Sequence, residues 1–403
     1  MARALVFLTD AFGGKGGIAQ FNRDLLTSLC SDDAYGRVVA LPRILFDRPE
    51  RVPKNLTFRV ESAGGRMRYV RESVRAVVRE RYDVVICSHI NLMPIAAAAA
   101  AAQRVPLLLV VYGIEAWTPP KSRLAARLVK RADAVVAISE HTKRRFLEWS
   151  GVDAPRVHVI PCCVDAGKFG LGPKRDDLLE KYGLQGRKVL LTVARLSGAE
   201  RAKGIDEVME SLTDIARDVP NVSYLVVGEG TDRQRLERRA TELGVSARVV
   251  FAGFVSEQEK ADHYRLADLF VMPGRGEGFG IVYLEALACG LQIVASSLDA
   301  SGEVVLNRRF GRVVNPDRPG EIKAAVVDLL KAPAHSIPRE LSTFSVARFR
   351  ARWNWLLTEM KVGDLASLPA QSREPATSGV RADDEMYGVE SPTQASSPVA
   401  LER

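Results

Sequence analysis

Short apolar segments alternate with segments of helical periodicity along most of the chain. The apolar segments are nearly continuous and rich in Val, Leu and Ile, which is typical of strands buried on both faces of a parallel sheet. Their alternation with helices predicts an α/β protein with doubly wound sheets. The expected strands are Ala4–Thr9, Val38–Leu41, Asp83–Cys87, Pro106–Val111, Ala134–Ser139, Lys188–Val193, Val222–Val227, Arg248–Ala252, Leu269–Met272 and Gln292–Ala295.

The length of the chain and the composition of its connecting segments indicate two domains. A single core rarely serves more than about 250–300 residues, so 403 residues are expected to form two cores. Near the end, Ser345 is expected to cap a helix over Val346–Lys361. The predicted division is a first domain over 1–170, a linker over 171–187, a second domain over 188–343, a helix over 344–362 and a disordered tail over 363–403.

Positive charge is concentrated in the first half of the chain. Residues 1–175 contain 28 Lys and Arg against 16 Asp and Glu, whereas the remainder contains 29 against 33. The basic half suggests an anionic partner or surface. Nucleic acid is not expected, because no basic motif is interleaved with aromatic residues. The segment Met67–Tyr82 is expected to be a helix that displays arginines, to solvent or to anionic lipid, and buries an apolar stripe of Met67, Val70, Val74, Val77 and Val78.

The cysteine pattern and the hydropathy exclude several classes of protein. Five scattered cysteines predict neither a disulfide framework nor a metal site. No apolar run reaches the 18 or so residues that a membrane-spanning helix needs, so none is expected. The apolar stretch at the N-terminus is too short for a signal peptide and is expected to be a buried strand. Together these features predict a cytoplasmic protein.

Glycines and charged residues gather where the expected strands end. The first strand is followed by a Gly-rich turn over residues 13–17, and Gly228-Glu229-Gly230 follows another strand. Arg195 and Lys203 come after Lys188–Val193, and two cations at a strand's carboxyl end suit a diphosphate. In a doubly wound sheet such ends converge on a single crevice.

Two glutamates that flank seven residues mark a further loop and helix. Glu277 precedes Gly278-Phe279-Gly280 at the expected start of a helix over Ile281–Cys289, and Glu285 lies about two turns further along. Backbone N–H groups at a helix start can bind phosphate, and carboxylates can accept hydrogen bonds from sugar hydroxyls. The pattern therefore predicts a site for a nucleotide sugar.

Together these motifs resemble the retaining glycosyltransferases of family 4, which have the GT-B architecture. The resemblance spans about residues 1–361 and is most specific in the second half. It implies two Rossmann-like domains that face a cleft, with the last helix crossing back to the first domain. The matching motifs are Gly16-Gly17, Arg195 with Lys203-Gly204, Gly228-Glu229-Gly230, Glu277-Gly278-Phe279-Gly280 with Glu285, Val255-Ser256, Tyr264–Asp268 and Gly311–Pro316.

The resemblance also implies roles for individual residues. Arg195 and Lys203 would neutralise the diphosphate as it leaves, and Glu277 would orient the hydroxyls of the transferred sugar. Glu285 would bind the ribose, while Gly17, Gly228, Gly278, Phe279 and Gly280 would line the nucleotide-sugar site. No Asp-x-Asp pair occurs in the chain, so no metal and no other cofactor is expected.

The acceptor is expected to bind the first domain. His89 follows a buried strand and is a further candidate for a catalytic residue, and Ser139 matches a family position near the acceptor. Tyr112 stands on the acceptor side where the family commonly has a histidine. Two other departures are Cys162-Cys163 in place of Asn-Gly and Gly274 in place of Ser.

The segments Glu200–Gly204 and Ser88–Leu92 are similar to those of a bacterial subgroup whose members often transfer mannose to lipid-linked intermediates of polysaccharide assembly. This similarity favours mannose from GDP-mannose, and a lipid-linked or membrane-associated glycan as acceptor at the cytoplasmic face of the membrane. Two alternatives stay open: a nucleotide-sugar epimerase of the same architecture, and an inactive scaffold that binds a nucleotide sugar.

Overall fold

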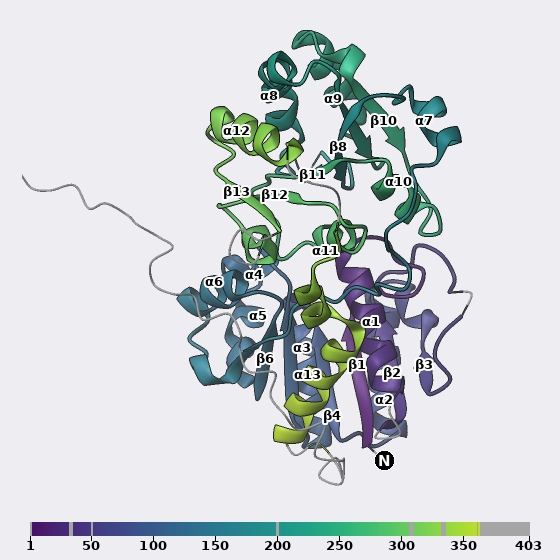
Figure 1. The fold of residues 1–403 in the computed structure, drawn as a ribbon. Coiled ribbons are helices and arrows are strands. Elements are labelled where there is room, and N and C mark those ends of the chain that lie inside the picture. The colour runs from purple at the N-terminus through teal and green to yellow at the C-terminus, as the bar shows by residue number, and fades with distance from the viewer. Residues whose placement is uncertain are drawn as a thin grey trace, which may run out of the picture.

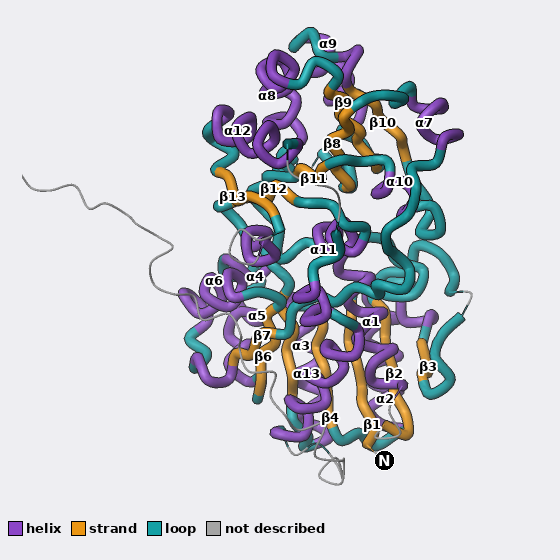
Figure 2. The backbone as a smooth tube through the Cα atoms, in the orientation of Figure 1, coloured by secondary structure: helices purple, strands orange, loops and turns teal. Residues whose placement is uncertain are grey.

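The structure is a computed structural model that describes residues 2–31, 35–49, 51–198, 201–305, 310–331, 336–360 and 362. The predicted disordered tail, residues 363–403, lies outside the described residues. The described chain forms two parallel sheets, each covered by helices on both faces, one above the other in Figure 1. Figure 2 shows the strands of each sheet enclosed between helices. The predicted fold class, two doubly wound α/β domains, is confirmed.

The first sheet has seven strands in the order β3-β2-β1-β4-β5-β6-β7. All of its neighbouring strands are parallel. The residues of β4 and β5 are buried throughout, because helices cover both faces of the sheet. The strands are β1 (Ala2–Leu8), β2 (Tyr35–Pro42), β3 (Leu56–Phe58), β4 (Val84–Ser88), β5 (Leu107–Val111), β6 (Ala134–Ala137) and β7 (Val157–Val159).

The second sheet has six strands in the order β10-β9-β8-β11-β12-β13, again all parallel. The expected strands Lys188–Val193 and Val222–Val227 coincide with β8 and β9. Three short strands, β3, β7 and β13, were not among the expected ones. The strands are β8 (Lys188–Val193), β9 (Val222–Val227), β10 (Val249–Gly253), β11 (Leu269–Val271), β12 (Ile293–Ser296) and β13 (Gly311–Val314).

Thirteen α-helices connect and cover the sheets within the described ranges. Local sequence explains several of their starts: the hydroxyl oxygens of Ser122 and Ser139 accept backbone N–H bonds at the first turns of α5 and α6. The helices are α1 (Gly17–Ser31), α2 (Arg66–Arg79), α3 (Met93–Gln103), α4 (Ile114–Trp117), α5 (Arg123–Leu128), α6 (Glu140–Ser150), α7 (Asp176–Tyr182), α8 (Ile205–Asp218), α9 (Arg233–Glu242), α10 (Lys260–Arg265), α11 (Ile281–Ala288), α12 (Pro319–Leu330) and α13 (Val346–Glu359).

The last helix crosses back to the first domain, as expected. Ser345 caps α13 by accepting a hydrogen bond from the backbone N–H of Arg348 at 3.3 Å. The rings of Phe349 and Trp353 then pack against Phe21 of α1, with centroids 5.3 and 6.4 Å apart. Figure 1 shows α13 beside α1 in the lower domain. This helix therefore ties the end of the second domain to the first.

Helix α2 differs from the expectation. The sequence predicted that its apolar stripe would be buried, but Met67, Val70, Val74 and Val78 are exposed. Only Val77 of the five stripe residues packs against the core. The side that faces the sheet consists instead of Tyr69, Glu72, Ser73 and Ala76. The small Ser73 and Ala76 side chains let the helix approach closely, and the Tyr69 hydroxyl bonds the carbonyl oxygen of Leu41. The predicted orientation of this helix was wrong.

Candidate nucleotide-sugar site

The two sheets face each other at their switch points. In each sheet the strand order reverses beside a central strand, between β1 and β4 in the first and between β8 and β11 in the second. Ligands of doubly wound proteins bind at the carboxyl ends of strands at such points. The loops at these ends contain the Gly-rich turn after β1, His89 after β4, Arg195 after β8 and Glu277 after β11.

The two domains touch at Gly278. A Cβ atom added to this glycine would lie 1.8 Å from the carbonyl oxygen of Tyr112 and 3.1 Å from the Cα atom of Gly113. No side chain fits there without moving backbone. Nearby, the Thr142 hydroxyl lies 3.5 Å from the carbonyl oxygen of Gly278, and the Glu303 carboxylate accepts backbone bonds from Glu140 and His141. The structure therefore shows the crevice with its two sides in contact.

Lys203 and Glu277 form the central charge pair of the crevice. The Lys203 ammonium lies 2.9 Å from Oε2 of Glu277, and the side chains are 22% and 19% exposed. The backbone N–H of Glu277 donates to Asp299 at 2.9 Å, which fixes the loop that carries it. Burial raises the pKa of Asp299 against the hydrogen bonds it accepts from Ser301 and Glu277. Two of the predicted catalytic residues, Lys203 and Glu277, therefore lie in contact on the side of the crevice formed by the second domain.

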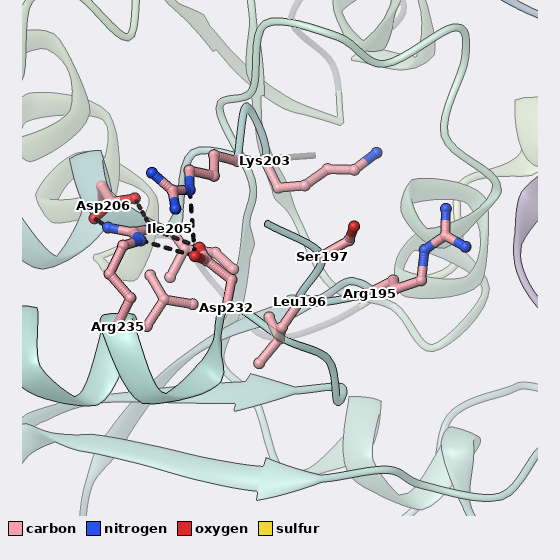
Figure 3. Close-up of a pocket in the computed structure, with 10 residues that line it drawn as sticks. Arg195, Leu196, Ser197, Lys203, Ile205, Asp206, Asp232 and Arg235 are labelled. Atoms are coloured by element: carbon pink, nitrogen blue, oxygen red, sulfur yellow. Dashed lines mark hydrogen bonds and ion pairs between the residues drawn. The ribbon is translucent and has the colours of Figure 1, made fainter. Parts of the chain in front are cut away.

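Arg195 extends into the same region. Figure 3 shows the side chains of Arg195 and Lys203 pointing away from an ion-pair cluster in which Arg235 binds Asp206 and Asp232. That cluster joins the starts of α8 and α9, and Arg201, shortly before Lys203, lies 3.3 Å from Asp232 in the same cluster. Across the crevice, burial raises the pKa of Asp10, while Thr9, Arg23 and Arg195 oppose the shift. Arg195 is thus within electrostatic reach of the first domain.

Glu285 lies on α11 and is 5% exposed. Its Oε1 atom is 2.9 Å from the Lys260 ammonium, and its Oε2 atom accepts a hydrogen bond from the Tyr264 hydroxyl at 2.7 Å. Burial opposes the charge on Lys260, but Glu285 and Glu257 raise its pKa overall. The predicted ribose ligand is therefore a carboxylate held in a fixed orientation by α10.

The predicted glycines and Phe279 lie in different surroundings. Gly17 begins α1, and a Cβ atom there would meet nothing within 4 Å, so the backbone is open to a ligand. A Cβ atom on Gly228 would lie 1.8 Å from the carbonyl oxygen of Ala194, so this glycine lets the loops after β8 and β9 pack. Gly280 directly precedes α11. Phe279 is buried, and its ring lies 5.7 Å from that of Phe344.

Tyr112 and Ser139 have buried side chains. The Tyr112 hydroxyl donates to Asn22 at 2.8 Å and also contacts Ser88, which in turn contacts Asn22. The Ser139 hydroxyl donates to Thr142 at 2.9 Å while accepting the backbone bond that caps α6. Both side chains already have hydrogen-bond partners within the first domain.

His89 follows β4, and its Nδ1 atom accepts a hydrogen bond from the backbone N–H of Asn91 at 3.1 Å. Burial lowers the pKa of His89 to about 4. The imidazole is therefore neutral at physiological pH, with Nε2 left as the atom that carries a proton.

Three contributors were missed in the sequence. Asp299 fixes the Glu277 loop, Lys260 holds Glu285, and Glu303 bridges the domains through α6. Asp299 comes shortly after β12, and its position near the carboxyl end of a strand could have marked it as a candidate site residue. Lys260 and Glu303 contact partners 25 and 162 residues away, respectively, and no local pattern encodes such pairs.

The arrangement suits a leaving diphosphate. Arg195 and Lys203 line one hollow, and the Lys203 ammonium contacts the carboxylate of Glu277 in the loop that precedes α11. Cations and helix N-termini stabilise anionic charge as it develops on a leaving group. Among the described residues, no cluster of three His, Cys, Asp or Glu side chains could hold a metal ion. Within the same residues, no helix is both long and apolar enough to cross a membrane.

Two family models together match most of the chain. The model described as "Glycosyltransferase Family 4" matches residues 15–168, and the one described as "Glycosyl transferases group 1" matches residues 174–342. The fold is similar to that of HepE from Anabaena in complex with UDP and glucose, with a TM-score of 0.69 and 20% identity over 89% of this chain and all of that one. Fold and site thus define a glycosyltransferase of the GT-B architecture.

Proteins similar in sequence indicate which glycosyltransferases this chain is related to. The chain is 35% identical over 267 residues to the GDP-mannose-dependent alpha-(1-6)-phosphatidylinositol monomannoside mannosyltransferase of Mycolicibacterium smegmatis, covering 63% of this chain and 68% of that protein. Its identity to the enzyme of the same name from Mycobacterium tuberculosis is 28% over 394 residues, covering 90% and 98%. The chain belongs to glycosyltransferase family 4, as the resemblance implied.

Proposed function

We propose that this enzyme transfers mannose from GDP-mannose to a lipid-linked or membrane-associated glycan, with retention of the anomeric configuration and without a metal ion. The observation that carries the proposal is the Lys203–Glu277 ion pair. Lys203 also lines one hollow together with Arg195 (Figure 3). The relatives named above support mannose and guanine, and their acceptor, phosphatidylinositol monomannoside, is the first candidate.

The chemistry assigned to the site is a front-face substitution. An acceptor hydroxyl oxygen bonds to the anomeric carbon as the bond from that carbon to the diphosphate breaks, and the hydroxyl proton passes to the departing phosphate oxygen. Arg195, Lys203 and the backbone of Gly278 and Gly280 stabilise the negative charge that develops there. Glu277 orients the sugar hydroxyls. No covalent intermediate with the enzyme is needed.

The other proposed roles are divided between the two domains. Residues 188–343 bind the nucleotide sugar, with Glu285 accepting hydrogen bonds from the ribose and Gly228 shaping the loop beneath it. Residues 1–170 bind the acceptor. There Gly17 lets backbone approach the diphosphate, and neutral His89 donates a hydrogen bond through Nε2. Tyr112 and Ser139, whose side chains are buried, shape the acceptor side, and Phe279 supports the loop of Glu277.

The proposed reaction takes place at the surface of a membrane, because GDP-mannose is water-soluble and the proposed acceptor is a lipid. We assign it to the cytoplasmic face, as expected from the sequence. Closure of the two domains around both substrates would exclude water and suppress hydrolysis of GDP-mannose. The contacts between Gly278 and Tyr112, and between Glu303 and α6, support such a closed arrangement.

Thermal unfolding with GDP, UDP or ADP tests the nucleotide part of the proposal. A ligand at 100 times its dissociation constant stabilises a protein by about 2.7 kcal/mol, which a melting curve resolves. We expect GDP to raise the melting temperature more than UDP or ADP. Stabilisation by UDP alone would show that the donor is a UDP-sugar and not GDP-mannose. No response to any of the three would overturn the assigned site.

A further inference from the structure

Asp10 is a carboxylate of the first domain that lies at the crevice. It comes directly after β1, one of the two strands that flank the switch point of the first sheet, and it is 9% exposed. Its Oδ1 atom accepts a hydrogen bond from the Thr9 hydroxyl at 3.0 Å. Within the described part of the chain, no lysine or arginine forms an ion pair with this carboxylate. A largely buried carboxylate without a cation is costly, so its retention at a binding crevice suggests a ligand.

Buried hydrogen bonds fix the position of Asp10. The side-chain amide of Asn22 donates to the backbone carbonyl oxygen of Asp10 at 2.8 Å, and the Tyr112 hydroxyl donates to Asn22 at 2.8 Å. A Cβ atom on Gly14 would lie 2.6 Å from Oδ2 of Asp10, so a glycine leaves room for this oxygen. Tyr112 therefore acts through Asn22 as a positioning residue for Asp10.

The charges around Asp10 indicate which kind of ligand it suits. Burial raises the pKa of Asp10, and the charge on Arg195 across the crevice opposes this shift. Arg23 donates to the backbone carbonyl oxygens of Ala11 and Gly14 at 3.0 and 2.9 Å, so it holds the turn and does not bond the carboxylate. A carboxylate repels a diphosphate but accepts hydrogen bonds from neutral hydroxyl groups. A sugar hydroxyl thus suits Asp10 better than the diphosphate does.

His89 stands near Asp10 at the same edge of the sheet. Leu8 at the end of β1 pairs with Ser88 at the end of β4, so Asp10 and His89 follow neighbouring strands directly beyond this pair. The carboxylate can only accept a hydrogen bond, whereas the neutral imidazole can donate one through Nε2. Adjacent hydroxyls of one sugar ring offer a donor to the first group and an acceptor to the second.

We propose that Asp10 binds a hydroxyl group of the acceptor sugar next to the one that attacks the donor. The attacking hydroxyl gives its proton to the departing phosphate oxygen, so the hydroxyl that bonds Asp10 is a different one on the same ring. This bond fixes the rotation of the acceptor and thereby selects which hydroxyl reaches the anomeric carbon. The inference rests on the proposed function, because it requires a glycan acceptor.

Transfer kinetics with octyl α-mannoside as acceptor test this assignment. Asp10→Asn retains the size of the side chain but removes the charge that accepts the hydroxyl. It should raise KM for octyl mannoside about 10–100-fold, as expected for the loss of a hydrogen bond to a charged group. KM for GDP-mannose, and the slow hydrolysis of GDP-mannose without acceptor, should not change. Asp10→Ala should have the same effect on the acceptor.

Monodeoxy analogues of octyl mannoside identify the hydroxyl. One analogue should show a similar rise in KM with the wild-type enzyme and no further rise with Asp10→Asn, because variant and analogue remove the same hydrogen bond. The other analogues should lose affinity independently of the variant. A purely structural role of Asp10 would not distinguish one analogue from the others.

Asp47→Asn is the matched control, because it removes a first-domain carboxylate whose side chain is 69% exposed. It should leave both KM values unchanged, and all variants should keep their melting temperature and their response to GDP. A normal acceptor KM for Asp10→Asn, a rise in KM for GDP-mannose instead, or additive losses with every analogue would overturn the assignment while the proposed function stands. Absence of transfer to any mannoside by the wild-type enzyme would overturn both.

Discussion

The ammonium group of Lys203 lies 2.9 Å from Oε2 of Glu277, although 74 residues separate the two in sequence. The contact joins the loop after β8 to the loop after β11, the two strands that flank the switch point of the second sheet. Both side chains are about one-fifth exposed. The pair therefore orders the two loops while leaving both groups within reach of a ligand.

Replacing either member of this pair should impair catalysis far more than stability. We expect Lys203→Met and Glu277→Gln each to lower kcat by ~10²–10³, because each removes a preorganised charge from the reacting centre. The loss of a partly exposed ion pair should change the free energy of unfolding by only ~1 kcal/mol or less. Arg217→Met, which breaks an exposed ion pair with Asp214, is the control for kcat. Unchanged transfer in both site variants would refute their assignment.

Gly278→Ala tests the contact between the domains. Its Cβ atom would overlap the carbonyl oxygen of Tyr112, so the two backbones would have to separate. We expect the free energy of unfolding to fall by about 1–3 kcal/mol, together with a loss of transfer activity. Gly320→Ala, where a Cβ atom meets nothing within 4 Å, should have neither effect. Equal behaviour of the two variants in thermal denaturation and transfer assays would contradict the close contact.

The sequence predicts the layout of this protein better than its side-chain environments. Helix α11 and β8 follow from continuous apolar runs between glycines, and the cap at Ser345 locates α13. Strands of three residues, such as β3 and β7, are too short to show periodicity. Apolar runs and helix caps can be predicted because each depends only on residues that are close together in the sequence.

Contacts between distant segments could not be predicted in this way. The orientation of α2 depends on how closely Ser73 and Ala76 approach the sheet, which periodicity does not reveal. The buried hydrogen bond between Tyr112, which follows β5, and Asn22 of α1 joins residues 90 apart in sequence, so it depends on the order of the strands in the sheet. For the site, strand ends indicated Lys203 and Glu277, but nothing local indicated Lys260 as the partner of Glu285.

Glu285 and Lys260 allow structural and binding roles to be separated. Glu285→Gln should lower the free energy of unfolding by ~3 kcal/mol, because it leaves the largely buried Lys260 without its nearest carboxylate. The double variant Glu285→Gln/Lys260→Met should recover much of that stability. Both variants should bind GDP about 10–100-fold more weakly, since a hydrogen bond to a charged group is worth about 1.5–3 kcal/mol. Normal GDP affinity in the double variant, measured by calorimetry, would limit Glu285 to a structural role.

Asp24 should make stability depend on pH. Burial raises its pKa from 3.8 to about 6, against the opposing hydrogen bond from Gln20. In the folded state the group thus keeps its proton more readily, and its contribution to stability is lost as pH rises through about 4–6. Asp24→Asn should therefore stabilise the protein more at pH 8 than at pH 4, with a difference of up to ~3 kcal/mol.

Chemical denaturation at the two pH values measures this difference. Asp153→Asn, at a side chain that is 81% exposed, is the control and should show little dependence on pH. The same change in stability for Asp24→Asn at both pH values would show that Asp24 ionises normally in the folded protein.

The most direct test is mannosyl transfer itself, with the anomeric configuration of the product determined by NMR. The purified enzyme is incubated with GDP-mannose and a lipid-linked mannoside, without added metal and with a chelator present. We predict an α-mannosylated lipid and an equal amount of released GDP, both formed ~10²–10³ times more slowly by Glu277→Gln. A β-linked product, turnover of GDP-mannose to another nucleotide sugar without acceptor, or binding of GDP-mannose without transfer to any lipid acceptor would contradict the proposed function.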